Sequence, residues 1–268
     1  MSTTESGGLI GNRSADLPAR LVGHLDIIIA LARREVQSRF GENALGYAWT
    51  YVVPLVWIAA TYFAFQLFAR TPPVFTDTIT FIISGLIPYA AFRYVITAVA
   101  RSTTTVRGLL IFPSVTEEHA IATAALIEFA NIFIVYAIVA LINSLAFGNG
   151  ELYNPLQFSA GVALAWMLGA GYAYLFAVLA RLNPTFAQVG QVLLRPAFFV
   201  SGIFFTANEL PDRLLNVLWW NPLLHAVEIA RDGMLFHYDS RIASPEYVLV
   251  WIAGLFLTGA TVDYLRRR

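Results

Sequence analysis

The chain has 268 residues, of which 58% are hydrophobic and only 13% are charged, and its 17 basic residues are all arginine. Soluble domains carry about 25% charged residues, so this composition excludes a soluble enzyme and indicates an all-α integral membrane protein with about six spans of about 20 residues. The absence of lysine excludes a nucleotide-binding P-loop, whose lysine contacts the phosphates, and the absence of cysteine excludes disulfides and thiolate chemistry.

The first forty residues contain two kinds of segment. Residues 1–20 are rich in serine, threonine and glycine, lack the apolar core of a cleaved signal peptide, and are expected to form a mobile tail. Residues 24–40 repeat apolar side chains at three- and four-residue spacing, with Arg33 and Arg34 on the other side. This pattern predicts an amphipathic helix that lies in the membrane interface.

Apolar windows bounded by charged residues predict six membrane-spanning helices in one transmembrane domain. They cover about residues 47–69, 79–100, 120–147, 156–180, 187–207 and 247–262. Before the last window, residues 211–236 contain two apolar stretches on either side of Asn221-Pro222, which is a turn signal. Each stretch is too short to cross a bilayer, so a re-entrant helical hairpin is expected.

The arginines outside the spans predict the orientation. If both termini lie in the cytoplasm, the inner segments carry eleven arginines and the outer segments carry four. Cytoplasmic loops are enriched in arginine and lysine. We therefore expect both termini on the cytoplasmic side, with Arg70, Arg213, Arg231 and Arg241 on the outer side.

Three ionisable residues, Arg93, Glu128 and Arg195, fall inside predicted spans. A charge at the bilayer centre costs roughly 2.5–3.5 kcal/mol, so each must pair, reach the interface or face water. Glu128 and Arg195 lie about 12–18 Å from the cytoplasmic ends of their spans, a depth that suits a salt bridge between them. The three residues either stabilise helix packing or line a polar path for an anionic or hydroxylated substrate; a proton relay is a third hypothesis.

Aromatic residues are concentrated in the first and fifth spans and in the hairpin. Tyrosine and tryptophan at span ends usually anchor a helix at the membrane interface. The alternative is a stacking surface for sugar rings, whose C–H faces pack on aromatic planes. On this alternative the candidate path residues, beside the three ionisable ones, are Tyr51, Trp57, Tyr62, Phe198, Phe199, Trp219 and Trp220.

The cytoplasmic stretch 108–119 is a second candidate site. Ser114 and Glu117 have the spacing of a capping box, which predicts that a helix starts there. Such a helix either caps the bundle or docks on a cytoplasmic motor protein. The histidines lack metal-ligand spacing and no nucleophile–histidine–acid arrangement is found, so neither a metal site nor a catalytic site is expected in this chain.

Four segments carry family-like motifs. In chain order they are RREVQSRFGENALGYAWTYVVPL, FIISGLIPYAAF, LLIFPSVTEEHAIATAALIE and FFVSGIFFTANELPDRLLNVLWWNPLLHAVEIAR. Together they resemble the permeases of type-2 ABC exporters, and in particular the branch that exports capsular polysaccharide and O-antigen. One departure is RLNPT at residues 181–185, where many relatives have an Arg-Asp pair.

The resemblance implies a membrane subunit in the bacterial inner membrane that pairs with a second copy of itself and with two separate ATPase subunits, which bind ATP and Mg. Periplasmic and outer-membrane export proteins are implied as further partners, and no nucleic acid is. The first and fifth spans would line the polymer path, and residues 211–231 would gate its outer mouth. The ATPase would dock on Arg33, Arg34, Arg39, Phe112, Pro113, Glu117 and Glu118.

Three functional hypotheses follow. The leading one is the membrane subunit of an ATP-driven exporter of a polysaccharide, with or without a lipid anchor. Within the same family, O-antigen, teichoic acid or small lipophiles are alternative substrates. The third hypothesis is an ion-coupled secondary transporter in which Glu128 carries the coupling proton.

Overall fold

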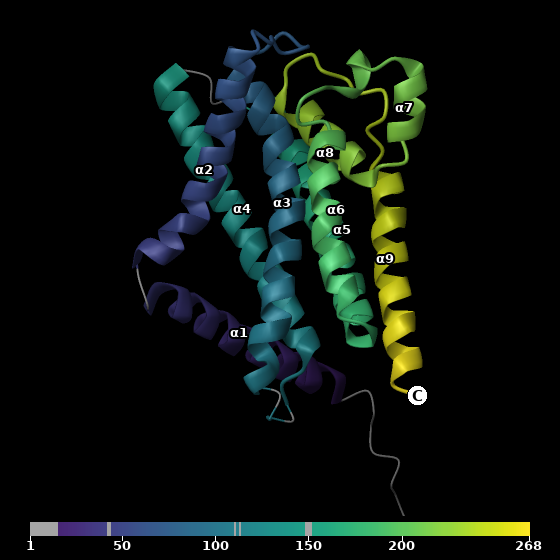
Figure 1. Ribbon diagram of the computed structural model, residues 1–268. Coiled ribbons are helices and arrows are strands. Elements are labelled where there is room, and N and C mark those ends of the chain that lie inside the picture. The colour runs from purple at the N-terminus through teal and green to yellow at the C-terminus, as the bar shows by residue number, and fades with distance from the viewer. Residues whose placement is uncertain (1–15, 42–43, 110, 113, 148–151) are drawn as a thin grey trace, which may run out of the picture.

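The computed structural model describes residues 16–41, 44–109, 111–112, 114–147 and 152–268. Within these ranges the regular structure is helical, which confirms the predicted fold class (Figure 1). The α-helices are α1 (Asp16–Gly41), α2 (Ala44–Leu67), α3 (Thr78–Thr105), α4 (Glu117–Phe147), α5 (Pro155–Leu182), α6 (Thr185–Val200), α7 (Asp212–Leu218), α8 (Pro222–Met234) and α9 (Pro245–Arg266). Two short 3-10 helices, η1 (Val106–Leu109) and η2 (Ala207–Glu209), follow α3 and α6.

A short polar residue followed by proline starts three of the helices. The side chains of Asn154, Asn221 and Ser244 each accept a hydrogen bond from a backbone N–H in the following turn, at 3.1–3.3 Å. Proline fits the next position because the first N–H groups of a helix have no partner within it. Asp77 starts α3 in a similar way and accepts from the backbone N–H of Thr80 at 2.8 Å.

Helices α3 and α5 form the centre of the bundle (Figure 1). Helix α3 packs against α2, α4, α5, α6 and α8, and α5 packs against α6, α8 and α9 as well. In the most apolar stretch of α3, 78% of the residues are buried, compared with 17% in α2 and 22% in α9. Helices α2 and α9 therefore form the outside of the single subunit and present apolar side chains to their surroundings.

The described residues contain five helices that are long and apolar enough to cross a membrane, where the sequence predicts six: α2, α3, α4, α5 and α9. Helix α6, in the place of the predicted fifth span, has 16 residues. At 1.5 Å per residue it is about 24 Å long, which is less than the hydrocarbon core of about 30 Å. It ends at Val200 instead of residue 207 because the chain turns at Gly202, which has a φ of +81°.

The two ends of the bundle differ. Helix α1 lies across the end that holds the C-terminus, and it packs against α4 and α2 (Figure 1). It begins at Asp16, so residues 16–20 are helical instead of belonging to the expected tail, whose residues 1–15 lie outside the described part of the chain. At the other end, α7 and α8 occupy the segment predicted to form a hairpin, and α8 is buried along its length from Leu223 to Met234.

Candidate functional site

A buried ion pair lies where α8 meets the segment that follows α6. Glu228 and Arg231 are one turn apart on α8 and both are 0% exposed, and Arg231 Nη1 donates to Glu228 Oε1 at 2.6 Å. Arg231 also donates to the backbone carbonyls of Gly202, at 2.6 Å, and Phe205, at 3.0 Å. Arg231, one of the four arginines predicted on the outer side, is therefore enclosed by the protein and is not a solvent-exposed charge.

The same pair holds two further segments. Glu228 Oε2 accepts hydrogen bonds from the hydroxyls of Tyr238 and Ser240, at 2.5 and 2.7 Å, in the connection that leads to α9. Arg231 Nε donates to Ser84 Oγ on α3 at 3.3 Å. Hydrogen bonds from this pair thus join four segments at this end of the bundle: α3, the turn after α6, α8 and the connection to α9.

Glycine is needed at two positions around Arg231. A Cβ on Gly85 would lie 2.9 Å from Arg231 Nη2, and Gly202 has the positive φ that side chains rarely adopt. These glycines belong to the Ser84-Gly85 and Ser201-Gly202 motifs of the second and fourth family-like segments. The two motifs therefore serve the same residue: Gly85 leaves room for the Arg231 guanidinium group, and Gly202 presents its carbonyl oxygen to it.

Asp232 adds a pH-dependent element to the network. It is buried next to Arg231, and Ser240 N donates to its Oδ1 at 3.0 Å. Burial, followed by the negative charge of Glu228, raises the pKa of Asp232 from 3.8 to about 7. The folded chain thus holds this proton more tightly than the unfolded chain does. The contribution of Asp232 to stability is therefore complete below pH 3.8 and is lost as the pH rises through about 7.

Replacing Asp232 with asparagine is expected to remove this loss, so that the melting temperature of the variant falls less than that of the wild type between pH 5 and pH 8. Burial lowers the pKa of His225, which favours folding at the higher pH, but this group is common to both proteins and cancels in the comparison. Asp212→Asn, at an exposed position, is the control and should leave the slope unchanged. Parallel pH profiles for Asp232→Asn and the wild type would contradict the assignment.

An aromatic strip runs along α2, α3 and α6. Neighbouring rings in it have centroids 5.2–6.4 Å apart, and its members are Trp57, Phe65, Tyr89, Phe198, Phe199 and Phe204. An arginine lies over each end, with the Cζ of Arg93 5.5 Å from the Trp57 ring and the Cζ of Arg70 5.6 Å from the Phe65 ring. Trp57 and Phe199 are 38% and 65% exposed, so the strip has an accessible face. A groove of about 400 Å³ adjoins its Arg70 end.

The aromatic strip and its arginines contain four of the predicted path residues: Trp57, Arg93, Phe198 and Phe199. Arg195 is exposed and precedes Phe198 and Phe199 by three and four residues on α6, which places it on the same face of that helix. Tyr62 lies on α2 with its ring 6.1 Å from that of Phe63. Sequence reasoning did not select Phe65, Tyr89 and Phe204 as path residues. Tyr89 reaches the strip through its contact with Phe198, and Phe65 and Phe204 reach it by packing on each other where the chain turns after α6.

Glu128 lies on a different part of the molecule. It is buried on α4 and accepts a hydrogen bond from Asn131 Nδ2 at 3.4 Å, while the Tyr51 hydroxyl donates to Asn131 Oδ1 at 3.4 Å. Arg195 lies on α6, which packs against α3 and α5. Among the ion pairs of the described residues none joins Glu128 to Arg195, although their predicted depths suit a salt bridge.

The two tryptophans of the turn between α7 and α8 also lie apart from the strip. The rings of Trp219 and Tyr247 have centroids 4.7 Å apart, and the Tyr247 hydroxyl donates to the backbone carbonyl of Trp220 at 3.1 Å. These contacts hold the turn against α9. Trp219 and Trp220 therefore form a second aromatic group, which is not continuous with the aromatic strip.

The acidic residues expected to receive the ATPase are engaged within the chain. Arg181 Nε lies 2.7 Å from Glu117 Oε2, and Arg181 Nη1 lies 2.7 Å from Asp263 Oδ1. Arg267 Nη2 lies 2.6 Å from both Glu118 Oε1 and Asp263 Oδ2. This inner ion cluster ties the ends of α4, α5 and α9 together, so Glu117 and Glu118 have a structural role in this subunit.

The other residues of the expected docking surface are accessible where they are described. Arg33 and Arg34 are exposed on α1, and Phe112 is 59% exposed beside Ile111, which is 82% exposed. Pro113 and the side chain of Arg39 lie outside the described residues. Two exposed arginines and an exposed apolar pair are thus both available to a partner protein.

Comparisons with known proteins agree in placing the chain among membrane transport proteins. The family model described as ABC-2 type transporter matches residues 27–235. The chain is 30% identical to polysialic acid transport protein KpsM of Escherichia coli, over 85% of this chain and 89% of that protein. It is 25% identical to capsule polysaccharide export inner-membrane protein CtrC of Neisseria meningitidis serogroup A, over 88% of this chain and 89% of that protein. It is 22% identical to O-antigen export system permease protein RfbA of Myxococcus xanthus, over 94% of this chain and 96% of that protein.

Proposed function

The chain belongs to the ABC-2 type transporter family, and from this premise we propose that it is the membrane subunit of an ATP-driven exporter of capsular polysaccharide in a bacterial inner membrane. Two of the three relatives described above are named for the transport of polysialic acid or capsule polysaccharide. ATP and Mg are bound by separate ATPase subunits, which agrees with the absence of lysine from this chain. The work of this chain is to provide the path.

The aromatic strip is the observation that carries the assignment of the path. Ring faces offer sugar C–H groups a surface for packing without fixing the polymer at one register, and the flanking Arg93 and Arg70 attract anionic or hydroxylated groups. Because Trp57 and Phe199 are exposed on the outside of a single subunit, the path lies between two copies of the chain. Each copy contributes one aromatic strip.

The proposed arrangement in the membrane has six crossings and cytoplasmic termini. Helix α6 and residues 201–207 together form the fifth crossing, and α7 with α8 forms a re-entrant hairpin at the outer face. Two ATPase subunits dock at the end that holds α1, on Arg33 and the exposed Ile111-Phe112 pair. The inner ion cluster then transmits their movement to α4, α5 and α9, because Glu117, Arg181 and Asp263 join these helices.

Deletion of the gene tests this function. The expected result is that a polysaccharide accumulates in the cytoplasm and that export returns with the wild-type chain, provided that the ATPase partner keeps its P-loop lysine. Retention of a small lipophile in place of a glycan would overturn the polysaccharide assignment. Loss of export on adding a protonophore at constant cellular ATP, together with full export by the ATPase lysine variant, would favour the secondary transporter instead.

Arg93→Ala is expected to reduce export about tenfold with little change in the amount of folded protein, because each charge-assisted contact contributes about 1.4 kcal/mol or more. Arg93 is partly exposed and stacks on Trp57, so it is available to a substrate. Export is measured as extracellular polysaccharide per folded permease. Arg213→Ala, at an exposed position on the outer side, is the control. If export per folded permease were unchanged because less protein folds, Arg93 would have a role in helix packing and not in the path.

A further inference from the structure

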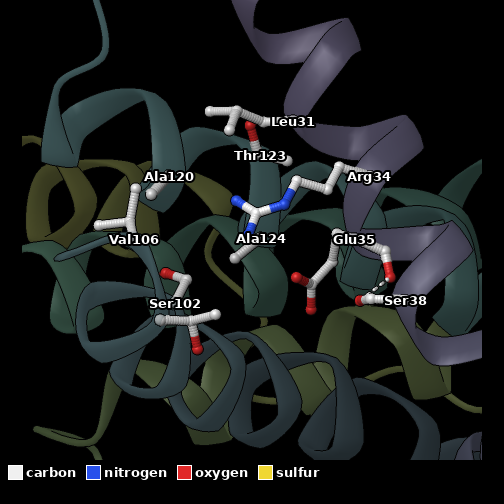
Figure 2. A pocket seen from close by; sticks show the side chains of 10 residues that line it. Leu31, Arg34, Glu35, Ser38, Ser102, Val106, Ala120, Thr123 and Ala124 are labelled. Carbon is white, nitrogen blue, oxygen red and sulfur yellow. Dashed lines mark hydrogen bonds between the residues drawn. The ribbon is translucent and has the colours of Figure 1, made fainter. Parts of the chain in front are cut away.

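A pocket lies beneath α1, where this helix crosses the inner ends of α3 and α4. Its volume is about 130 Å³, and four of its ten lining residues are apolar: Leu31, Val106, Ala120 and Ala124. The other six are polar: Arg34, Glu35, Ser38, Ser102, Thr105 and Thr123. Figure 2 shows the ends of the Arg34 and Glu35 side chains reaching from α1 into this space.

The wall contains a polar group that lacks a partner. Thr123 is 4% exposed, and its hydroxyl has no hydrogen-bond partner among the described residues. A buried hydroxyl without a partner costs about 1–3 kcal/mol relative to one that is hydrogen-bonded. The pocket therefore contains a group that gains from a ligand with a hydrogen-bond acceptor.

The pocket is placed where a phospholipid of the membrane can enter it. Helix α1 lies across the end of the bundle, and its side chains Val22, Leu25 and Ile29 are 56%, 55% and 48% exposed. Exposed apolar residues on a helix that also carries arginines are typical of a helix in the membrane interface. The inner ends of two candidate spans, α3 and α4, form the opposite wall. A ligand that enters from the side thus comes from the inner leaflet.

The charges in the wall define the headgroup. Arg34 offers a planar fork of donors that fits a phosphate, and Glu35 next to it offers a carboxylate. A carboxylate has about four acceptor sites, so Glu35 can receive an ammonium group beside the contacts that it already makes. A purely anionic headgroup would meet Arg34 but would be repelled by Glu35. A quaternary ammonium headgroup has no N–H to donate to Glu35.

We propose that this pocket binds the phosphoethanolamine headgroup of an inner-leaflet phospholipid. The phosphate pairs with Arg34, the primary ammonium group pairs with Glu35, and a phosphate oxygen accepts from Thr123. The bound lipid holds α1 against α3 and α4. On this proposal Arg34 binds the lipid and is not part of the surface that receives the ATPase. The proposal rests on the part of the proposed function that embeds the chain in the bilayer, and it does not depend on which polymer is exported. A negative result in the glycan-export test would therefore leave the lipid proposal standing, and the reverse also holds.

The test measures lipid retention by the purified full-length chain in native mass spectrometry. Dioleoyl phosphatidylethanolamine, phosphatidylglycerol and phosphatidylcholine are titrated separately, so that only the headgroup differs. The wild type is expected to bind the ethanolamine lipid about tenfold more tightly than the other two, and Arg34→Ala should lose about tenfold for that lipid, because one bidentate phosphate contact is worth about a factor of ten or more. Arg33→Ala, on the adjacent exposed residue of the same helix, is the matched control and should bind as the wild type does.

Two further measurements keep the proposal falsifiable if Arg34→Ala does not fold. Glu35→Gln keeps the shape of the side chain and is expected to abolish the preference for ethanolamine over glycerol headgroups, a loss of selectivity that a general loss of stability would not produce. Soluble glycerophosphoethanolamine should compete at least a hundredfold more weakly than the lipid, because it lacks the acyl chains. Equal competition by the soluble compound, an equal or higher affinity of the wild type for phosphatidylglycerol, or an equal loss in Arg33→Ala would overturn the proposal.

Discussion

Arg231→Met is expected to leave little folded protein in the membrane. The substitution removes the guanidinium group that neutralises Glu228, and both residues are fully buried. Breaking a buried ion pair by removing one partner costs about 3–5 kcal/mol, a large part of the 5–15 kcal/mol that holds a typical protein folded. The carbonyl oxygens of Gly202 and Phe205 lose their donor at the same time. The measurement is the yield of monodisperse protein after detergent extraction, together with its melting temperature.

The double variant Glu228→Gln, Arg231→Met shows whether Arg231→Met destabilises the protein by leaving the Glu228 charge unpaired or by removing hydrogen bonds. Removing both charges relieves the cost of leaving one unpaired, so the double variant is expected to be more stable than Arg231→Met alone. Arg241→Ala is the matched control, because Arg241 also pairs with an acidic residue, Asp212 at 3.3 Å, but both side chains are exposed. Exposed pairs contribute about 0–1 kcal/mol. If Arg231→Met and Arg241→Ala melted at similar temperatures, the Glu228–Arg231 pair would not be what holds α8 in the bundle.

The helices that span the bundle could be predicted from the sequence because their limits depend on local chemistry. Charged residues and cap–proline pairs such as Asn154-Pro155 and Ser244-Pro245 mark helix ends within a few residues. The predicted fifth span fails at its C-terminal end for a reason that is not local. Residues 203–205 continue the apolar pattern, but the chain has already turned at Gly202 to present its carbonyl to Arg231.

The candidate site was less predictable because its partners come from distant segments. Arg231 has the appearance of an ordinary surface charge, since its contacts on Ser84 and Gly202 lie far away in the sequence. The aromatic strip could be predicted only in part, for the same reason. Trp57 and Phe198 were identifiable as aromatic residues in spans, but the sequence does not show that Tyr89 on α3 packs its ring against Phe198 beside Trp57.

Replacing glycine with alanine is expected to destabilise the protein at the contact between α5 and α8, at Gly161. The same replacement is expected to be neutral or stabilising at Gly254 on α9. A Cβ on Gly161 would lie 2.4 Å from the backbone nitrogen of Ala230, so Gly161→Ala forces two buried helices apart. Overpacking of this kind costs about 1–3 kcal/mol, which exceeds the gain of about 1 kcal/mol that alanine brings to a helix interior. Around Gly254 on α9 nothing lies within 4 Å of the added Cβ, so Gly254→Ala retains that gain.

Gly161→Ala is therefore expected to lower the melting temperature in detergent, and Gly254→Ala is expected to raise it or leave it unchanged. The effect at Gly161 should also reach Glu228 and Arg231, because these residues flank Ala230 on α8 and move with it. Combining Gly161→Ala with Arg231→Met should then cost less than the sum of the two single substitutions, since residues in one network do not act additively. Changes of the same sign at both glycines would mean that α8 is free to shift on α5, and that the buried pair does not fix the position of α8.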